Sequence, residues 1–174
     1  VGLIACQWAK HLGATVIGTT SSEEKAKLAR EHGCDHVIDY TKEDVAERVK
    51  EITNGRKLPV VYDGVGKATF LSSLDSLAPL GLLVSFGNAS GPVTDVNLGI
   101  LAQKGSLYVT RPTMYHYAAK TPTAFQEMAD DLFAVVKSGA VKIEVNQRYS
   151  LAEAARAHLD LEGRKTTGAS VLVP

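Results

Sequence analysis

The sequence predicts an α/β fold whose centre is a doubly wound parallel sheet. Short β-branched segments alternate with helix-length amphipathic segments up to Pro112, and five segments of the first kind can be counted. Strands that alternate with helices of this length form right-handed βαβ units, which build a parallel sheet covered on both faces. The pattern changes after Pro112, so we expect a second part of the chain there.

Composition narrows the class of protein. The 174 residues fit about one domain and at most two. The 19 basic residues balance the 19 acidic ones, which gives no electrostatic reason to expect a nucleic acid or a membrane as partner. The two cysteines, Cys6 and Cys34, form no CxxC pair, which excludes a disulfide scaffold and a cysteine-rich zinc module. Because no signal-peptide pattern is found, we expect a cytoplasmic protein.

The expected elements of the first part follow in regular order. The strands cover residues 15–19, 36–38, 60–62, 82–86 and 107–110. The first helix ends before Gly13, where a left-handed cap belongs. Capping boxes of Ser21 with Glu24 and of Thr41 with Asp44 open the second and third helices. Two more helices are expected over residues 70–77 and 97–103.

The second part begins with a long helix, for which Thr121 is the expected cap and Pro122 the first helical residue. Its apolar face carries Phe125, Met128, Leu132 and Val136. A strand that ends at Tyr149, a helix opened by Ser150 and Glu153, and a last strand over residues 169–173 complete the chain. We interpret this tail as different from another βαβ repeat.

A glycine-rich turn joins the first strand to the first helix of a Rossmann-type sheet. In this sequence the first helix is preceded by Gly2 and by no strand. We therefore expect the sequence to begin inside that turn, and the predicted fold is a Rossmann-type sheet that lacks its first strand.

The tip of the first expected strand, residues 19–22, carries hydroxyl groups and no carboxylate. In dinucleotide-binding folds an acidic residue at this place bonds the ribose hydroxyls of NAD. Small hydroxyls leave room for a 2′-phosphate, and Lys25 can supply a cation one turn later. The alternative is that Ser21 and Ser22 only cap a helix and that Lys25 is solvated.

Glycine turns directly follow two expected strands, at residues 63–66 and 86–88. Ligands of open α/β sheets bind outside the carboxyl ends of the strands, where glycine lets the backbone approach them. Two such turns favour binding, although each is also compatible with an ordinary strand-to-helix connection.

Other chemistry has weaker support. His32, Cys34 and His36 could suggest a metal site, but Gly33 ends the helix between them, so the histidines do not share a face and we expect no metal. We interpret both cysteines as small core residues. No GxSxG or HExxH motif supports a hydrolase.

Five segments carry a family resemblance: residues 2–10, 61–66, 84–91, 97–101 and 105–112. They resemble the bacterial NADPH:quinone oxidoreductases, in the zinc-free, zeta-crystallin-like branch of the medium-chain dehydrogenase/reductase superfamily. The resemblance implies that residues 1–116 are most of an NADP-binding Rossmann domain. It also implies that residues 117–174 are the C-terminal return segment of a catalytic domain, and that the sequence is a C-terminal fragment.

The same resemblance implies which residues contact NADP(H). The pyrophosphate would face Val1 and Gly2, and the adenosine or ribose would face Val65. The residues implied around the 2′-phosphate are Ser21, Ser22, Lys25, Tyr40 and Arg164. Those implied along the nicotinamide half are Phe86, Gly87, Asn88 and Ala89, with Pro112 and Thr113 as weaker candidates. The catalytic residues stay unknown.

The implied activity is hydride or electron transfer from NADPH to a quinone or related conjugated carbonyl. We expect the 174 residues alone to be inactive, because the substrate cleft needs a second lobe. A homodimer is expected through the strand near residues 106–110, anchored by Leu107 and Val109. The alternatives are a non-catalytic dinucleotide-binding or crystallin-like structural module, and another Rossmann-like enzyme such as a methyltransferase.

Overall fold

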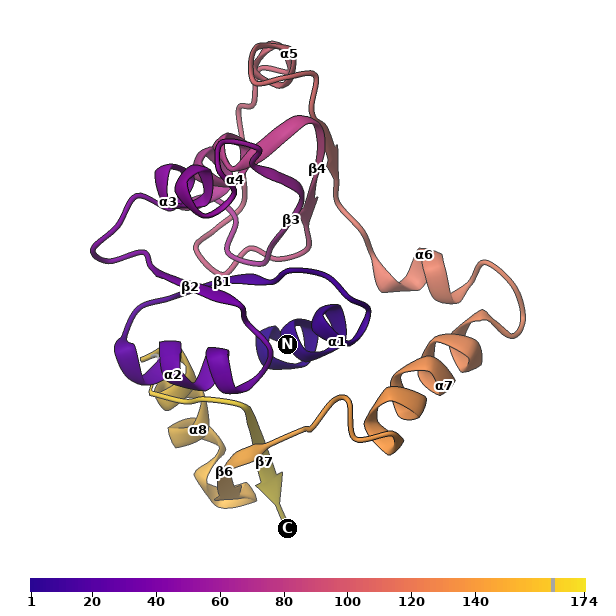
Figure 1. The fold of residues 1–174 in the computed structure, drawn as a ribbon. Helices are drawn as coiled ribbons and strands as arrows, with labels where there is room; N and C mark the ends of the chain where they lie inside the picture. The colour runs from indigo at the N-terminus through magenta and orange to yellow at the C-terminus, as the bar shows by residue number, and fades with distance from the viewer. Residues whose placement is uncertain (164) are drawn as a thin grey trace. The chain divides into compact units, whose positions relative to one another are not determined.

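The computed structural model describes residues 1–163 and 165–174 and divides the chain into two compact units (Figure 1). Unit 1 consists of Val1–Val37 and Ala129–Pro174, and unit 2 consists of Ile38–Met128. Each unit is described by itself below. None of the described helices combines the length and the apolar character needed to cross a bilayer.

Unit 1 begins with the α-β-α order that the sequence predicts. Its first elements are α1 (Gly2–His11), β1 (Ile17–Thr20) and α2 (Glu23–Glu31). The strand β2 (His36–Asp39) pairs with β1 and leads into unit 2. Glycines with positive φ follow both helices, with φ +85° at Gly13 and +93° at Gly33, as the sequence predicts.

Unit 2 contains a parallel three-stranded sheet of order β3-β4-β5. The elements of this unit are α3 (Val45–Ile52), β3 (Leu58–Asp63), α4 (Phe70–Asp75), β4 (Leu77–Ser85), α5 (Gly99–Gln103), β5 (Tyr108–Thr110) and α6 (Met114–Ala118). Helices α3 and α4 pack against each other, and α4 packs on β3 and β4 (Figure 1). Five residues form the core of the unit: Phe70, Leu74, Leu77, Leu83 and Leu107.

The strand orders explain why the predicted fold class is right. A doubly wound sheet has the order 3-2-1-4-5-6. When strand 1 is left out of this order, the neighbours 3-2 and 4-5-6 are left. The pair β1-β2 corresponds to the first group and the sheet β3-β4-β5 to the second. The parallel pairing follows from the helical connections between successive strands, because a parallel neighbour cannot be reached by a short hairpin.

The tail contradicts one prediction. After α7 (Ala124–Lys137), the chain forms β6 (Val145–Ser150), the 3-10 turn η1 (Leu151–Glu153), α8 (Ala154–Glu162) and β7 (Ala169–Val173). Strands β6 and β7 pair in parallel across α8, so the tail does contain a βαβ unit. The expected capping box of Ser150 and Glu153 is confirmed at η1.

Three helix starts lie later than predicted. Ser22 rather than Ser21 caps α2, and Asp44 rather than Thr41 caps α3. Helix α7 begins at Ala124, after the expected Thr121 and Pro122. The first half of the apolar face expected for it is open, since Phe125 is 59% exposed and Met128 is 41% exposed, whereas Leu132 and Val136 are half-buried.

Candidate functional site

Helix α1 starts at Gly2, and the carbonyl of Val1 accepts the first helical hydrogen bond, from Ala5 N at 3.0 Å. The first amides of a helix have no partner within the helix, and its dipole is positive at this end. The first turn carries no acidic residue. This end of α1 therefore carries free amide donors of the kind that bind anions.

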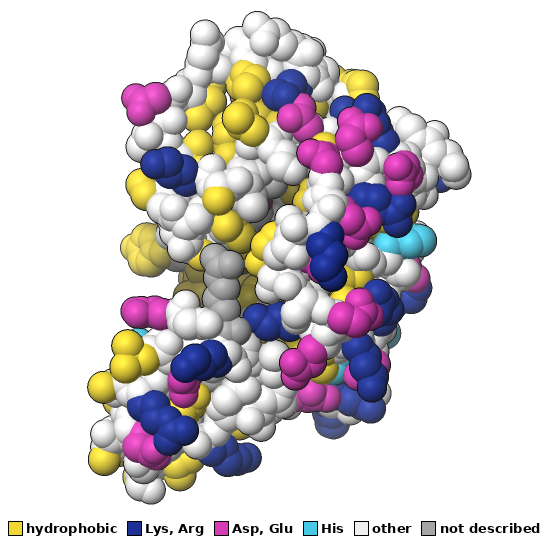
Figure 2. Space-filling model, turned by 90° about the vertical axis from the view of Figure 1, so that its left-hand side faces the viewer, with side chains coloured by type: hydrophobic (Ala, Val, Ile, Leu, Met, Phe, Trp, Pro, Cys, Tyr) yellow, Lys and Arg dark blue, Asp and Glu magenta, His cyan; other side chains and the backbone are white. Residues whose placement is uncertain are grey.

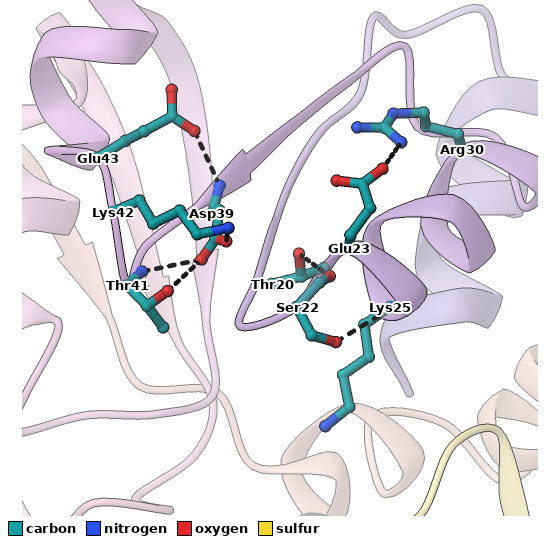
Figure 3. A network of polar contacts seen from close by, with 9 residues as sticks. All are labelled: Thr20, Ser22, Glu23, Lys25, Arg30, Asp39, Thr41, Lys42 and Glu43. Carbon is teal, nitrogen blue, oxygen red and sulfur yellow. Dashed lines mark hydrogen bonds and ion pairs between the residues drawn. The ribbon is translucent and has the colours of Figure 1, made fainter.

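Two hydrogen bonds order the loop after β1, as Figure 3 shows. Ser22 Oγ accepts from Lys25 N at 3.3 Å, and Thr20 Oγ1 donates to the carbonyl of Ser22 at 3.4 Å. Glu23 and Glu24 lie in the first turn of α2, and Arg30 binds Glu23 at 2.8 Å and offsets its charge. Ser22 thus does cap the helix, and Ser21 and Lys25 lie half-buried beside it.

Tyr40 follows β2. Its neighbour Asp39 organises the loop, as the contacts drawn in Figure 3 show. The Asp39 carboxylate accepts from Thr41 Oγ1 at 2.6 Å and from Thr41 N at 3.0 Å, and it pairs with Lys42 at 2.9 Å. These hydrogen bonds from Thr41 and Lys42 lower the pKa of Asp39 to about 2. The Tyr40 ring is left 45% exposed, so it is open to a ligand.

A buried carboxylate at the end of β3 organises the turn that holds Val65. Asp63 is 5% exposed, and its Oδ1 accepts from Val65 N at 2.8 Å and from Gly66 N at 3.1 Å. Its Oδ2 accepts from Thr69 Oγ1 at 2.7 Å and from Ser73 Oγ at 2.8 Å. One side chain therefore joins the strand, the turn and the first residues around α4.

Burial raises the pKa of the Asp63 carboxyl, but the hydrogen bonds from Thr69, Gly66, Val65 and Ser73 outweigh it and hold the pKa below its usual value. The charged form is thus stabilised by donors of the fold itself.

The turn at residues 64–67 is joined to the segment after β4. Phe86 N donates to the carbonyl of Asp63 at 2.8 Å, and Ser90 N donates to that of Val65, also at 2.8 Å. The hydroxyl of Ser90 accepts from Ala68 N and donates to the same Val65 carbonyl. We call residues 64–67 and 86–91 the paired glycine turns.

Glycine is required where these turns touch. A Cβ on Gly87 would lie 2.2 Å from the carbonyl oxygen of Gly64, and a Cβ on Gly66 would lie 2.8 Å from that of Gly91. Gly66 also has φ +89°, which side chains disfavour. The two turns can approach this closely only because Gly66 and Gly87 lack a side chain.

Arg111, which the sequence analysis did not single out as a site residue, holds the second turn in place. Its Nη1 donates to the carbonyl of Ser85 at 3.0 Å and to that of Gly87 at 2.9 Å. When the Asn88 side-chain amide is rotated so that its nitrogen and its oxygen both form hydrogen bonds, the oxygen accepts from Arg111 Nη2 at 3.3 Å. The signal in the sequence was a basic residue directly after the last expected strand of the sheet.

Pro112 and Thr113 line an open pocket of about 360 Å³ in unit 2. Its lining residues are Thr110, Arg111, Pro112, Thr113, His116, Tyr117 and Lys120. Arg111 contributes to this pocket and to the second glycine turn, so it connects Pro112 with the segment at residues 86–89.

In unit 2 the structure joins Val65 to the segment 86–89, whereas Tyr40 lies in the separate loop after β2, and one candidate is left undescribed. Val65 and the segment 86–89 lie in the paired glycine turns, where Val65 is 40% and Phe86 43% exposed. Val1, Gly2, Ser21, Ser22 and Lys25 belong to unit 1. Arg164 lies outside the described residues.

The charges of the surface are mixed. Lys and Arg side chains lie among Asp and Glu side chains on the face in Figure 2. Within residues 1–163 and 165–174, no group of three or more His, Cys, Asp or Glu side chains is arranged to hold a metal ion.

Comparison with known proteins decides the family. A family model described as zinc-binding dehydrogenase matches residues 1–134. The chain belongs to this family. Membership does not assign zinc to this chain, because its described residues offer no suitable ligand set.

Relatives within this dehydrogenase family include quinone oxidoreductases. The quinone oxidoreductase of Pseudomonas aeruginosa is 65% identical, and the match covers 100% of this chain and 53% of the relative. The Escherichia coli quinone oxidoreductase, whose crystal structure is a complex with NADPH, matches with a TM-score of 0.95 and 54% identity over 100% of this chain and 54% of that one. A 2-haloacrylate reductase from Burkholderia is 45% identical over 100% of this chain and 52% of its own length. The chain thus spans about half the length of the relatives it matches.

Asp63→Asn should lower the free energy of unfolding by about 1.5–3 kcal/mol, because an amide cannot accept from all the donors around this carboxylate. Since the folded-state pKa is lowered, the stabilisation is present above the unfolded pKa and disappears as the pH falls through the folded pKa. The difference from wild type should therefore be constant near neutrality and shrink below about pH 4. Urea unfolding measures the free energy of unfolding, and Asp131→Asn is the control because Asp131 is exposed. If the two variants were equally stable at pH 7, the role of Asp63 would be contradicted.

Gly87→Ala should separate the paired glycine turns, since the new Cβ would overlap the Gly64 carbonyl. Overpacking of this kind lowers the free energy of unfolding by about 1–3 kcal/mol or more. Gly99→Ala is the control, because its Cβ would meet only the Asn97 side chain, at 3.1 Å. Urea unfolding that ranks the two variants as equally stable would show that the turns can move apart freely.

Proposed function

We propose that this chain is the NADP(H)-binding part of an oxidoreductase that transfers a hydride or electrons from NADPH to a quinone or related conjugated carbonyl. The paired glycine turns carry the proposal, because they lie at the carboxyl ends of β3 and β4, where open α/β sheets bind ligands. The names of the quinone oxidoreductases among the relatives support it. The 2-haloacrylate reductase supports the wider class of acceptor, because a 2-haloacrylate is a conjugated carbonyl compound.

The proposed contacts follow the chemistry of each group. The first amides of α1, at Val1 and Gly2, would bind the pyrophosphate. Val65 would contact the adenosine or ribose. The 2′-phosphate would lie among hydroxyl and cationic groups, which are Ser21, Ser22, Lys25, Tyr40 and Arg164.

The nicotinamide half would lie along Phe86, Gly87, Asn88 and Ala89, near Pro112 and Thr113. NADPH supplies the reducing equivalents when bound. The residues of this chain would orient the nicotinamide ring and exclude water from it. The Phe86 ring, 43% exposed, provides apolar surface for this, and Arg111 positions the backbone that carries it.

We also propose that residues 1–116 serve as the NADP-binding part and residues 117–174 as a return segment of a catalytic domain. The open apolar face of α7, with Phe125 and Met128, supports a role in packing against further protein. A cytoplasmic location stays our prediction and rests on the two free thiols of the described residues.

NADPH should bind more tightly than NADH, because a hydrogen bond to a charged phosphate contributes about 1.5–3 kcal/mol. Lys25→Ala and Arg164→Ala in the intact protein should each weaken NADPH binding about 10- to 100-fold and leave NADH almost unchanged. Tyr40→Phe should have a smaller effect, of roughly tenfold at most, since its hydroxyl is neutral. Nucleotide fluorescence titration measures the Kd values.

Lys27→Ala is the matched control for Lys25→Ala, because Lys27 lies on the same helix and pairs with Glu31 at 4.0 Å. The Lys27→Ala variant should bind NADPH and NADH as tightly as the wild type does. If Lys25→Ala and Arg164→Ala weakened both nucleotides equally, the assignment of the phosphate site would be wrong.

A homodimer is proposed through the outer edge of β5, the last strand in the order β3-β4-β5. Leu107 cannot anchor it as expected, because it is 6% exposed and belongs to the core. Tyr108 and Val109 are 61% and 40% exposed and are the better anchors. An edge strand of this kind can pair with its two-fold copy.

Val109→Lys should convert the dimer to a monomer, because a charge on an edge strand opposes pairing. Light scattering at micromolar concentration measures the mass. Val96→Lys is the control, since Val96 is similarly exposed, at 38%, but lies in a loop. A wild-type protein that is already monomeric would refute the dimer.

A further inference from the structure

Cys6 and Cys34 bring their sulfur atoms within 3.3 Å of each other, although they lie 28 residues apart in the sequence. Cys6 lies on α1, and Cys34 lies in the turn between α2 and β2, so both belong to unit 1. Both are free thiols in the described chain. Cys34 is buried, at 6% exposure, whereas Cys6 is half-buried. The pair therefore joins an inner sulfur to a more accessible one.

The surrounding structure fixes this contact on several sides. Cys34 N donates to the carbonyl of Ala29 at 3.0 Å, which holds the turn against the end of α2. The next residue, Asp35, forms an ion pair with Lys10 of α1 and accepts from Val16 N at 2.9 Å. The turn is thus tied directly to the helix that carries Cys6.

Two glycines make room for the sulfur atoms. A Cβ on Gly18 would lie 2.8 Å from Cys34 Sγ, and a Cβ on Gly33 would lie 3.1 Å from the carbonyl oxygen of Cys6. Any larger residue at Gly18 would collide with the Cys34 thiol. The close approach of the turn to α1 depends on both positions.

The two thiols differ in acidity. The hydrogen bond from Cys34 lowers the pKa of Cys6 to about 7, against the opposing effect of burial and with help from the charge of His32. The same hydrogen bond, together with burial and the nearby charges of Cys6 and Asp35, raises the pKa of Cys34. The accessible sulfur is therefore the one that carries thiolate character near neutral pH.

His32 is held where it can act on Cys6. Its Nε2 lies 3.1 Å from Glu144 Oε1, and its Nδ1 lies 2.7 Å from the carbonyl of Leu28. When the ring is protonated, both nitrogens donate to these oxygens. The His32 side chain is buried, with 8% of its surface exposed.

We propose that Cys6 and Cys34 form a reversible disulfide site that is oxidised by a peroxide, with Cys6 as the attacking thiol and Cys34 as the resolving thiol. The Cys6 thiolate attacks one peroxide oxygen, the O–O bond breaks, and Cys6 becomes a sulfenic acid while hydroxide leaves. The Cys34 sulfur then attacks the Cys6 sulfur, the S–O bond breaks, and the hydroxyl leaves with the thiol proton as water. The hydroxide released in the first step takes up the proton that Cys6 lost on ionisation, so with hydrogen peroxide the sum is two thiols and one peroxide converted to one disulfide and two waters. The thiols lose two electrons and the peroxide gains them.

The movement required is small. A disulfide needs sulfur atoms at about 2.05 Å, so the present separation of 3.3 Å must shorten by about 1.3 Å. The new bond would connect α1 covalently to the turn before β2, which are now joined by the Lys10 to Asp35 ion pair.

Peptide mapping of the intact protein tests the proposal. The protein is treated with one equivalent of hydrogen peroxide, alkylated, and digested with trypsin without reduction. We expect the peptide that ends at Lys10 to be linked to residues 31–42, with the loss of two hydrogen atoms, and dithiothreitol to release both peptides. Two separately alkylated peptides after peroxide treatment would overturn the proposal without recourse to any variant.

Two variants test the order of attack. In Cys34→Ser the sulfenic acid on Cys6 has no resolving thiol, so dimedone should label Cys6 strongly, whereas it should label the wild type weakly. In Cys6→Ser the buried Cys34 should stay reduced at the same peroxide dose. Equal dimedone labelling of Cys6 in wild type and Cys34→Ser would contradict the role of Cys34, and oxidation of Cys34 in Cys6→Ser would reverse the assignment. Circular dichroism of both variants verifies their fold.

Discussion

The buried carboxylate of Asp63 connects more of the candidate site than any other single side chain described above. It accepts hydrogen bonds from the turn after β3 and from two hydroxyls around α4, and the backbone at the same residue accepts from Phe86 N. A carboxylate withdrawn from water is unfavourable unless its oxygens are occupied by donors. The turn must therefore keep the shape that supplies those donors, which preorganises the backbone at Val65 before any ligand arrives.

The second constraint is the absence of side chains where the paired glycine turns meet. Gly64 and Gly87 approach so closely that one methyl group would overlap a carbonyl oxygen. The approach leaves Val65 and Phe86 partly exposed, and Arg111 fixes the second turn from the end of β5. Asp63 holds the first of the paired glycine turns and Arg111 holds the second. The glycines allow the two turns to touch. A flat apolar ring could then be bound with little reorganisation of the backbone, which favours affinity.

The sequence predicted features that depend on local pattern and missed those that depend on distant partners. The alternation of strands with helices, the glycine caps at Gly13 and Gly33 and the turns after β3 and β4 follow from periodicity and from the backbone freedom of glycine. Local pattern could not choose between the adjacent hydroxyls of Ser21 and Ser22 as helix cap. It also could not show that β6 and β7 pair across α8, that Arg111 reaches Gly87, or that Cys6 meets Cys34. These contacts join residues 20 or more positions apart, so only the fold creates them.

The charge balance of the chain bears on how it could recognise a phosphate. With a net charge of zero and cations interspersed with anions, long-range attraction of an anion is weak (Figure 2). Many basic side chains are already occupied, such as Arg30 with Glu23 and Lys42 with Asp39. Recognition then depends on oriented donors at short range, including the first amides of α1 and the hydroxyls near Ser22. Such donors distinguish a phosphate from a hydroxyl by geometry and number of hydrogen bonds, so specificity can be strong even where the surrounding field is weak.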